Sequence, residues 1–303
     1  MAFDNGLGDF LMKIEVFLQV IANGLLTGGF YMAIAVGITL IFGVLNVIYF
    51  AYGESIMLGS YLSYFLLTLW GVDPLISLPL AIVMTSLLGA IVQKTMIKPV
   101  MKAPHLNQIL LTFGIAVILQ NIVLMAVGGD YVSITTSYSG TSLKIGPLRI
   151  GLVRFLEFLL SIVLTGGITL WLKYTNWGRA VRAVTQNEES AKLMGINVDR
   201  VYLITFVVGS ALGGAAGVMI SLMMYTFPLI GFNFVIKAFA IVILGGIGSI
   251  PGAVTGAMIL GVTESLVSQY FRGGSGWAEG VSFMMIIAVL LIRPGGLFYV
   301  KEG

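Results

Sequence analysis

Residues 14–45 read IEVFLQVIANGLLTGGFYMAIAVGITLIFGVL, and this stretch decides the fold. It holds one charged side chain, that of Glu15, close to its start. An α-helix rises about 1.5 Å per residue, so the stretch is longer than the roughly 30 Å of hydrocarbon that a spanning helix must cross. We therefore predict a transmembrane helix that is either strongly tilted or broken near Thr27-Gly28-Gly29.

Similar apolar runs fill the rest of the chain. Of its 303 residues, 58% are hydrophobic and only 10% are charged, with a mean hydropathy of +1.03. A soluble globular domain, whose apolar content is nearer half, is excluded. A transmembrane β-barrel is excluded because its strands alternate polar and apolar residues.

The sequence therefore predicts an all-α, polytopic transmembrane bundle, with residues 1–303 as a single transmembrane domain. The run 55–70 is short for a full crossing, so the number of spans is eight or nine. They are expected at about 14–45, 55–70, 75–96, 108–127, 153–173, 201–225, 232–248, 253–271 and 280–297.

The basic residues indicate how the bundle is oriented, because short cytoplasmic loops are enriched in Lys and Arg. With the C-terminus inside, ten of them face the cytoplasm: Lys94, Lys98, Lys102, Lys173, Arg179, Arg182, Lys192, Arg200, Arg293 and Lys301. Five face the other side: Lys13, Lys144, Arg149, Arg154 and Arg272. This bias favours a cytoplasmic C-terminus, whereas the side of the N-terminus depends on the number of spans. The first 13 residues lack the basic start of a cleavable signal peptide.

The sequence lacks the residues that disulfides, thiolate metal sites and common catalytic sites require. There is no cysteine, which excludes disulfides and thiolate metal sites, and the single histidine, His105, lies in a basic loop. We expect no catalytic residue, no metal site and no cofactor bound by this chain. The net charge of +3 is small and lies mostly in the loops. It is explained by the orientation of the protein in the membrane and does not indicate nucleic-acid binding.

The most informative loop is the polar loop, residues 174–200, which lies between two long apolar runs. We predict a short helix there with Arg179, Arg182 and Gln186 on one face and small alanines on another. Gly195 is expected to end this helix, and Asp199 to cap the next span. A projecting cytoplasmic helix suits docking to a soluble partner that supplies energy; the alternative is an ordinary positive-inside loop. The candidate coupling residues are Gly178, Arg179, Ala180, Arg182, Ala183, Asn187, Ala191 and Gly195.

Two further segments interrupt the apolar runs. The first, 46–54, contains an ionisable carboxylate, which costs a few kcal/mol at membrane depth and should face a cavity or partner. Broken helices are tolerated where they line a path through the membrane. Alternatively, this turn lies at the cytoplasmic surface and Glu54 caps the helix 55–70. The second segment, 245–252, is a glycine-rich turn that includes Pro251. The similarity of 245–256 to 46–60 suggests an internal repeat. The candidate path residues are Asn46, Tyr52, Gly53, Glu54, Gly245, Gly246 and Gly248.

These three segments together resemble one family, the branched-chain amino acid ABC transporter permeases, and most closely the H-type subunit of its H/M pair. The polar loop is similar to the family's ATPase-coupling loop through Gly178-Arg179-Ala180-Val181-Arg182-Ala183, Asn187, Ala191, Gly195-Ile196-Asn197 and Asp199-Arg200. A second stretch, Asn46 with Gly53-Glu54, Met57 and Gly59-Ser60-Tyr61, resembles another signature of the family. A third stretch, Lys237-Ala238-Phe239 with Leu244 to Ala253 and Gly256, resembles a further one.

The resemblance implies a membrane permease of an ATP-driven importer in the bacterial inner membrane. Its partners would be two ABC ATPase subunits that bind ATP and Mg, a second homologous permease, an extracytoplasmic substrate-binding protein and membrane lipid. The implied substrates are branched-chain or other neutral amino acids. Tyr52 stands where the family usually has His, so urea or short amides stay open as alternatives.

Other functions follow from individual side chains. A secondary transporter would use Glu54 and Glu264 as ion-coupling carboxylates, whereas a membrane enzyme lacks any nucleophile–base arrangement. Lys237 could meet a substrate carboxylate, although snorkelling to the interface is the simpler expectation. Glu157 is expected to be solvated near an interface. The loop 128–152, rich in Gly, Ser, Thr and Tyr, suits either an external contact or a solvated connector.

Overall fold

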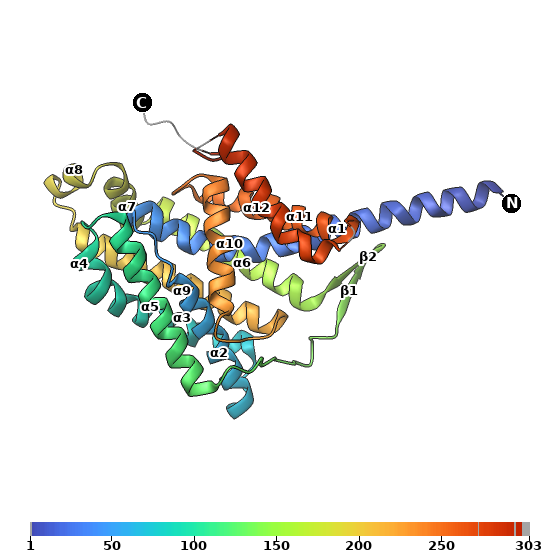
Figure 1. The fold of residues 1–303 in the computed structure, drawn as a ribbon, viewed down its shortest axis with the longest axis horizontal. Helices are drawn as coiled ribbons and strands as arrows, with labels where there is room; N and C mark the ends of the chain where they lie inside the picture. Colours follow the sequence, from blue (N-terminus) through green and yellow to red (C-terminus); the bar gives the residue numbers. More distant parts are fainter. Residues whose placement is uncertain (1, 272, 294, 299–303) are drawn as a thin grey trace.

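A computed structural model describes residues 2–271, 273–293 and 295–298, with side chains other than those of 2–11, 275 and 282. The chain forms a helical bundle (Figure 1). Its elements are α1 (Ala2–Leu45), α2 (Tyr52–Trp70), α3 (Pro74–Val92), a π-helical turn (Gln93–Ile97), α4 (Lys98–Val100), α5 (His105–Val127), β1 (Ser142–Ile145), β2 (Leu148–Gly151), α6 (Leu152–Tyr174), α7 (Asn176–Gln186), α8 (Glu188–Leu193), α9 (Val198–Met223), α10 (Ile230–Gly245), α11 (Ile250–Tyr270) and α12 (Gly274–Ile292).

The prediction of a helical membrane protein is confirmed. Within the described residues, six helices are long and apolar enough to cross a membrane: Met12–Leu45, Pro74–Val100, His105–Val127, Leu152–Tyr174, Val198–Met223 and Ile250–Tyr270. Two shorter apolar helices are Ile230–Gly245 and Gly276–Ile292. The count of eight or nine spans stays a prediction. The antiparallel hairpin of β1 and β2 was not predicted.

The helices α1 and α9 form the centre of the bundle. Nearly every residue of α1 from Phe30 to Ile41 is buried, and α1 packs against both α9 and α11. Of the two alternatives for the first span, the break near Thr27-Gly28-Gly29 is wrong, because α1 is continuous there. These small residues serve packing instead: a Cβ at Gly28 would lie 2.9 Å from Cα of Met258 in α11.

Two helices, α2 and α10, begin inside the bundle rather than at its ends. After α1 the chain turns at the exposed residue Asn46, whose φ is 53°, and returns along α1 through 47–51, whose side chains are buried or half-buried. The hydroxyl of Tyr52 then donates to the carbonyl oxygen of Ile34 at 3.0 Å, roughly 16 Å back from the end of α1 at 1.5 Å per residue. Because Gly53 and Gly231 each fill the space of the other's Cβ, α2 and α10 meet N-terminus to N-terminus.

The contacts of these helices have the form of an inverted repeat. The helix α1 packs against α11, as α9 packs against α3, and α1 meets α9 where Gly37 contacts Gly209. The counterpart of 46–51 is therefore 224–229, which leads into α10. The predicted pairing of 46–60 with 245–256 is wrong, because 245–249 is a tight turn between helices, like 71–73.

The bundle has two distinct ends. Figure 1 shows α7 and α8 at one end, with the end of α12, and the hairpin of β1 and β2 with the N-terminus at the other. The hairpin is held to α1 by Gln19, whose Nε2 donates to the carbonyl oxygen of Arg149 at 2.9 Å. The basic residues that we expected to be cytoplasmic gather at the end of α7 and α8, here called the inner end. Lys301 and Arg272 lie outside the described residues.

Candidate functional site

A cavity of about 1110 Å³ opens at the inner end. Its walls are the end of α1, residues 98–102, the α7–α8 junction and the start of α9. The candidate path residues Asn46 and Gly248 line it, and so does the candidate coupling residue Asn187. The structure therefore brings parts of both predicted sets to one place.

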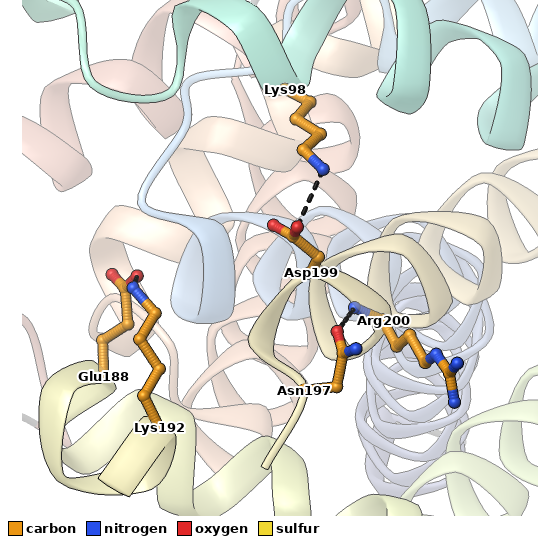
Figure 2. A network of polar contacts seen from close by, with 6 residues as sticks. All are labelled: Lys98, Glu188, Lys192, Asn197, Asp199 and Arg200. Carbon is orange, nitrogen blue, oxygen red and sulfur yellow. Dashed lines mark hydrogen bonds and ion pairs between the residues drawn. The ribbon is translucent and has the colours of Figure 1, made fainter. Parts of the chain in front are cut away.

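Ion pairs join the elements around this inner cavity (Figure 2). The Nζ of Lys98 lies 2.8 Å from Oδ2 of Asp199, which connects α4 to α9, and Lys192 lies 2.5 Å from Glu188 within α8. The hydrogen bond from Lys192 lowers the pKa of the Glu188 carboxyl and raises that of the lysine. All four side chains are exposed, so these pairs orient the loop more than they stabilise it.

The prediction that Asp199 caps α9 is wrong. The cap is Asn197, whose Oδ1 accepts the backbone N–H of Arg200 at 3.1 Å (Figure 2). Asp199 lies in the first turn of the helix, where its charge is favourable beside the N-terminal dipole.

The polar loop is fixed to the end of α6 by two of its candidate residues. A Cβ at Gly178 would overlap the carbonyl oxygen of Leu172, so only glycine allows this close approach. Arg182 donates a hydrogen bond to the same carbonyl, which places a cation at the C-terminus of α6. Arg179 is exposed and donates to Asn176.

The two faces of the polar loop differ as expected. Ala191 is buried and Ala180 and Ala183 are half-buried against the bundle, whereas Arg179 and Arg182 lie on the exposed side. The loop has two helices rather than one, because Asn187 ends α7 and caps α8 by accepting the N–H of Ser190 at 2.8 Å. Gly195, with φ of 81°, follows α8.

The tip of the polar loop carries two residues that sequence reasoning missed. Leu193 and Met194 are 89% and 83% exposed, which is unusual for apolar side chains at the water-facing end of a bundle. The N–H of Gly195 donates to the carbonyl oxygen of Lys192, and that of Ile196 to Ala191, both at 3.0 Å, so the tip is a fixed turn. The signal was two apolar residues directly before a glycine C-cap in a charged loop.

Three candidate path residues, Tyr52, Gly53 and Glu54, lie deep in the bundle rather than on a cavity wall. Glu54 is 1% exposed, its Oε1 accepts a hydrogen bond from Gln120 at 2.7 Å, and its Oε2 has no hydrogen-bond partner among the described residues. The surface alternative for this turn is therefore wrong, although Glu54 does lie in the first turn of α2.

Of the candidate residues, Gly245 is the last residue of α10 and Gly246 begins the tight turn that follows. Gly245 packs on the backbone of Gly252, and Gly246, with φ of 104°, packs on Gly296. Neither lines the inner cavity. Their place next to Gly248 indicates a packing role at the edge of the cavity.

A second cavity, of about 600 Å³, opens at the opposite end and is here called the outer cavity. Its walls are residues 131–135 and 221–227, the first two turns of α10, Tyr31 of α1 and Glu279 of α12. None of the candidate site residues lines it.

Lys237 lines the outer cavity and lies beside two carboxylates. It lies 3.2 Å from Glu264 and 3.1 Å from Glu279 and donates to the hydroxyl of Tyr31 at 3.0 Å. Lys237 is 15% exposed, so the expectation that it snorkels to the interface is wrong. The expectation for Glu157 is also wrong, because that carboxylate is buried in α6. The described residues hold no cluster of His, Cys, Asp and Glu suited to a metal ion.

The comparisons with known proteins agree on one family. Residues 20–290 match the family model described as branched-chain amino acid transport system / permease component. The chain is 35% identical over 301 residues to the high-affinity branched-chain amino acid transport system permease protein LivH of Escherichia coli, covering 93% of this chain and 95% of LivH. It is 33% identical over 298 residues to BraD of Pseudomonas aeruginosa, which has the same descriptive name, covering 94% and 96%.

A more distant relative represents a second type of permease. The probable branched-chain amino acid transport permease protein LivM of Methanocaldococcus jannaschii is 25% identical over 317 residues, covering 95% of this chain and 89% of LivM. No solved structure matches the chain significantly.

Proposed function

The chain belongs to the family of branched-chain amino acid transport permeases, and from this premise we propose that it forms the translocation path of an ATP-driven importer for branched-chain or other neutral amino acids. It is a multi-pass protein of the bacterial inner membrane. It is a transport component rather than an enzyme, since its relatives are named transport permease proteins.

We propose nine crossings, with the N-terminus outside and the C-terminus in the cytoplasm. Seven crossings are α1, α3, α5, α6, α9, α11 and α12. The other two are α2 with its lead-in 46–51 and α10 with its lead-in 224–229. The basic residues at the inner end support this orientation.

The polar loop is proposed to bind a separate ATPase subunit, and one observation carries this proposal. The exposed apolar pair Leu193 and Met194 projects from a loop that Gly178 and Arg182 attach to α6. A fixed apolar tip surrounded by charge has the composition of a docking surface. ATP and Mg would bind only to the partner, and force on the tip would reach α6 through the carbonyl of Leu172.

Substrate is proposed to pass between the outer and the inner cavity, where the starts of α2 and α10 now meet. Tyr52, Gly53 and Glu54 lie at that meeting point. Separating the two helix starts would connect the cavities, as alternating access requires. A binding protein would deliver substrate at the outer end, and a second permease related to LivM would complete the pair.

Purification of the tagged chain from its native membrane under mild detergent tests this function. We expect two ATPase subunits and a second permease to co-purify. Reconstituted into proteoliposomes with a substrate-loaded binding protein, this complex should take up leucine only with ATP. Uptake by the chain alone, driven by an ion gradient without ATP, would contradict the proposal.

A further inference from the structure

We propose that the outer cavity binds a zwitterionic amino acid. The ligand's carboxylate replaces Glu279 as an ion-pair partner of Lys237, and the ligand's ammonium then forms an ion pair with Glu279. The inference rests on the proposed function and names the residues that hold its substrate. None of the candidate coupling and path residues lies in this cavity, whereas Lys237, which the sequence offered as a partner for a substrate carboxylate, does.

The cation of Lys237 is held in place by partners that do not depend on Glu279. The hydroxyl of Tyr31 donates to Oε2 of Glu264 at 2.6 Å and accepts from Nζ of Lys237 at 3.0 Å. Glu264 also lies 3.2 Å from Nζ. These residues come from α1, α10 and α11, so the ammonium keeps its position when one further contact is lost.

The two carboxylates beside Lys237 differ in exposure. The side chain of Glu264 is 12% exposed and that of Glu279 is 63% exposed. Glu279 lines the outer cavity, whereas Glu264 does not. A buried ion pair is costly to break because it leaves an unpaired charge, while an exposed one is readily exchanged. Glu279 is thus the partner that an incoming carboxylate can replace.

Charge balance selects the kind of ligand. A zwitterion brings one carboxylate and one ammonium, so each member of the Lys237–Glu279 pair gains a new partner and the cavity keeps its net charge. An uncharged ligand such as urea offers neither group. An anion would satisfy Lys237 but leave Glu279 without a cation, and a cation would do the reverse.

The rest of the cavity suits an aliphatic side chain. Leu222, Met223, Phe227 and Phe234 form an apolar wall, and the volume of about 600 Å³ lies within the usual range for small-ligand pockets, roughly 300–1,000 Å³. A few charged groups beside an apolar wall are the usual composition of a small-molecule site.

The test pairs each side chain with the ligand group that it should contact. The purified transporter, without its binding protein, is titrated by saturation-transfer NMR with leucine, with leucinamide, which lacks the carboxylate, and with 4-methylpentanoate, which lacks the ammonium. For the wild type we expect each lost group to weaken binding about tenfold, as for a charged hydrogen bond. In Lys237→Met, leucine and leucinamide should bind equally; in Glu279→Gln, leucine and 4-methylpentanoate should bind equally.

Each outcome decides whether Lys237 contacts the ligand's carboxylate or only maintains the shape of the cavity. A full preference for leucine over leucinamide in Lys237→Met overturns the proposal, and so does the loss of both ligands, because the lysine then shapes the cavity without touching the carboxylate. Lys237→Arg keeps the preference if the charge is what matters. Glu279→Gln, at an exposed position, provides the second cycle if Lys237→Met does not fold. ATP-driven uptake by the wild type tests the proposed function separately.

Discussion

The inner and outer ends of the molecule hold cavities of different character. At the inner end, the ion pairs are exposed: Lys98–Asp199 connects the short helix α4 to the start of α9, and Glu188–Lys192 lies within the short helix α8. At the outer end, Lys237 and Glu264 are only 15% and 12% exposed and pair between long helices. Exposed pairs rearrange at little cost, whereas buried ones fix a geometry. The difference indicates an inner end suited to being moved by a partner and an outer end suited to recognising a ligand.

The proposed barrier between these two ends is the head-to-head contact of the starts of α2 and α10, so breaking this contact should have the largest effect. In Gly53→Ala the new Cβ overlaps the carbonyl oxygen of Gly231, and Gly231→Ala overlaps Gly53 in the same way. Overpacking of this kind costs about 1–3 kcal/mol. Each variant should lower the melting temperature of the purified protein.

Gly114→Ala is the matched control for this contact. Its position within α5 has open space around it, so the substitution should not destabilise the protein. If either Gly53→Ala or Gly231→Ala kept the wild-type melting temperature, the two helix starts would not be the tight contact between the ends.

The sequence revealed one of these helix starts and hid the other, which shows what sequence alone can give. Asn46 and Glu54 interrupt an apolar run, so the first discontinuity is visible. The second, 224–229, reads MYTFPL and continues the apolar pattern, so it was divided between the end of the span 201–225 and a short connector before 232–248. The polar loop, its small face and the turn at Gly195 were predicted because they depend on local rules. The outer cavity was not, because Tyr31, Lys237 and Glu279 meet only in the folded bundle.

The inner end should respond most strongly to changes at its apolar tip. In the double variant Leu193→Asp, Met194→Asp, we expect at least a tenfold drop in co-purified ATPase, since an apolar hot spot contributes 2 kcal/mol or more. The permease itself should remain folded, because both side chains are exposed. Quantitative mass spectrometry of the tagged complex measures the ratio.

Gln186→Asp, at the end of α7, is the matched control within the polar loop. It adds negative charge to the same exposed loop without removing apolar surface, and should keep the partner. Undiminished ATPase in the double variant would remove the tip from the docking surface.

A substitution at Glu54 tests whether the charge of this residue matters for transport or whether the side chain only packs between the starts of α2 and α10. Glu54→Gln keeps the shape and an acceptor for Gln120 but removes the ionisable carboxylate. We expect leucine uptake by the reconstituted complex to fall several-fold with little change in stability, because removing a buried charge lowers its desolvation cost. Glu157→Gln, at the other buried carboxylate, is the control and should leave uptake unchanged. Wild-type uptake by Glu54→Gln would leave this residue a packing role alone.

The smallest effect should come from the exposed pair on α8, where the comparison between the two ends predicts a local response. The hydrogen bond from Lys192 lowers the pKa of Glu188, so the pair's contribution is present above the ordinary carboxyl pKa of about 4.3 and is lost as pH falls through the lower folded value. The pKa of Lys192 is raised by the same bond, so the contribution persists up to the ordinary lysine value of about 10.4 and is lost as pH rises through the folded value.

In Lys192→Ala, an NMR titration of the Glu188 carboxyl should show its midpoint moving up toward the ordinary value, while Lys192→Arg should keep it low. Because the pair is solvated, leucine uptake near neutral pH should not change; a large loss of uptake in Lys192→Ala would mean that the inner end depends on fixed charges, as the outer end does.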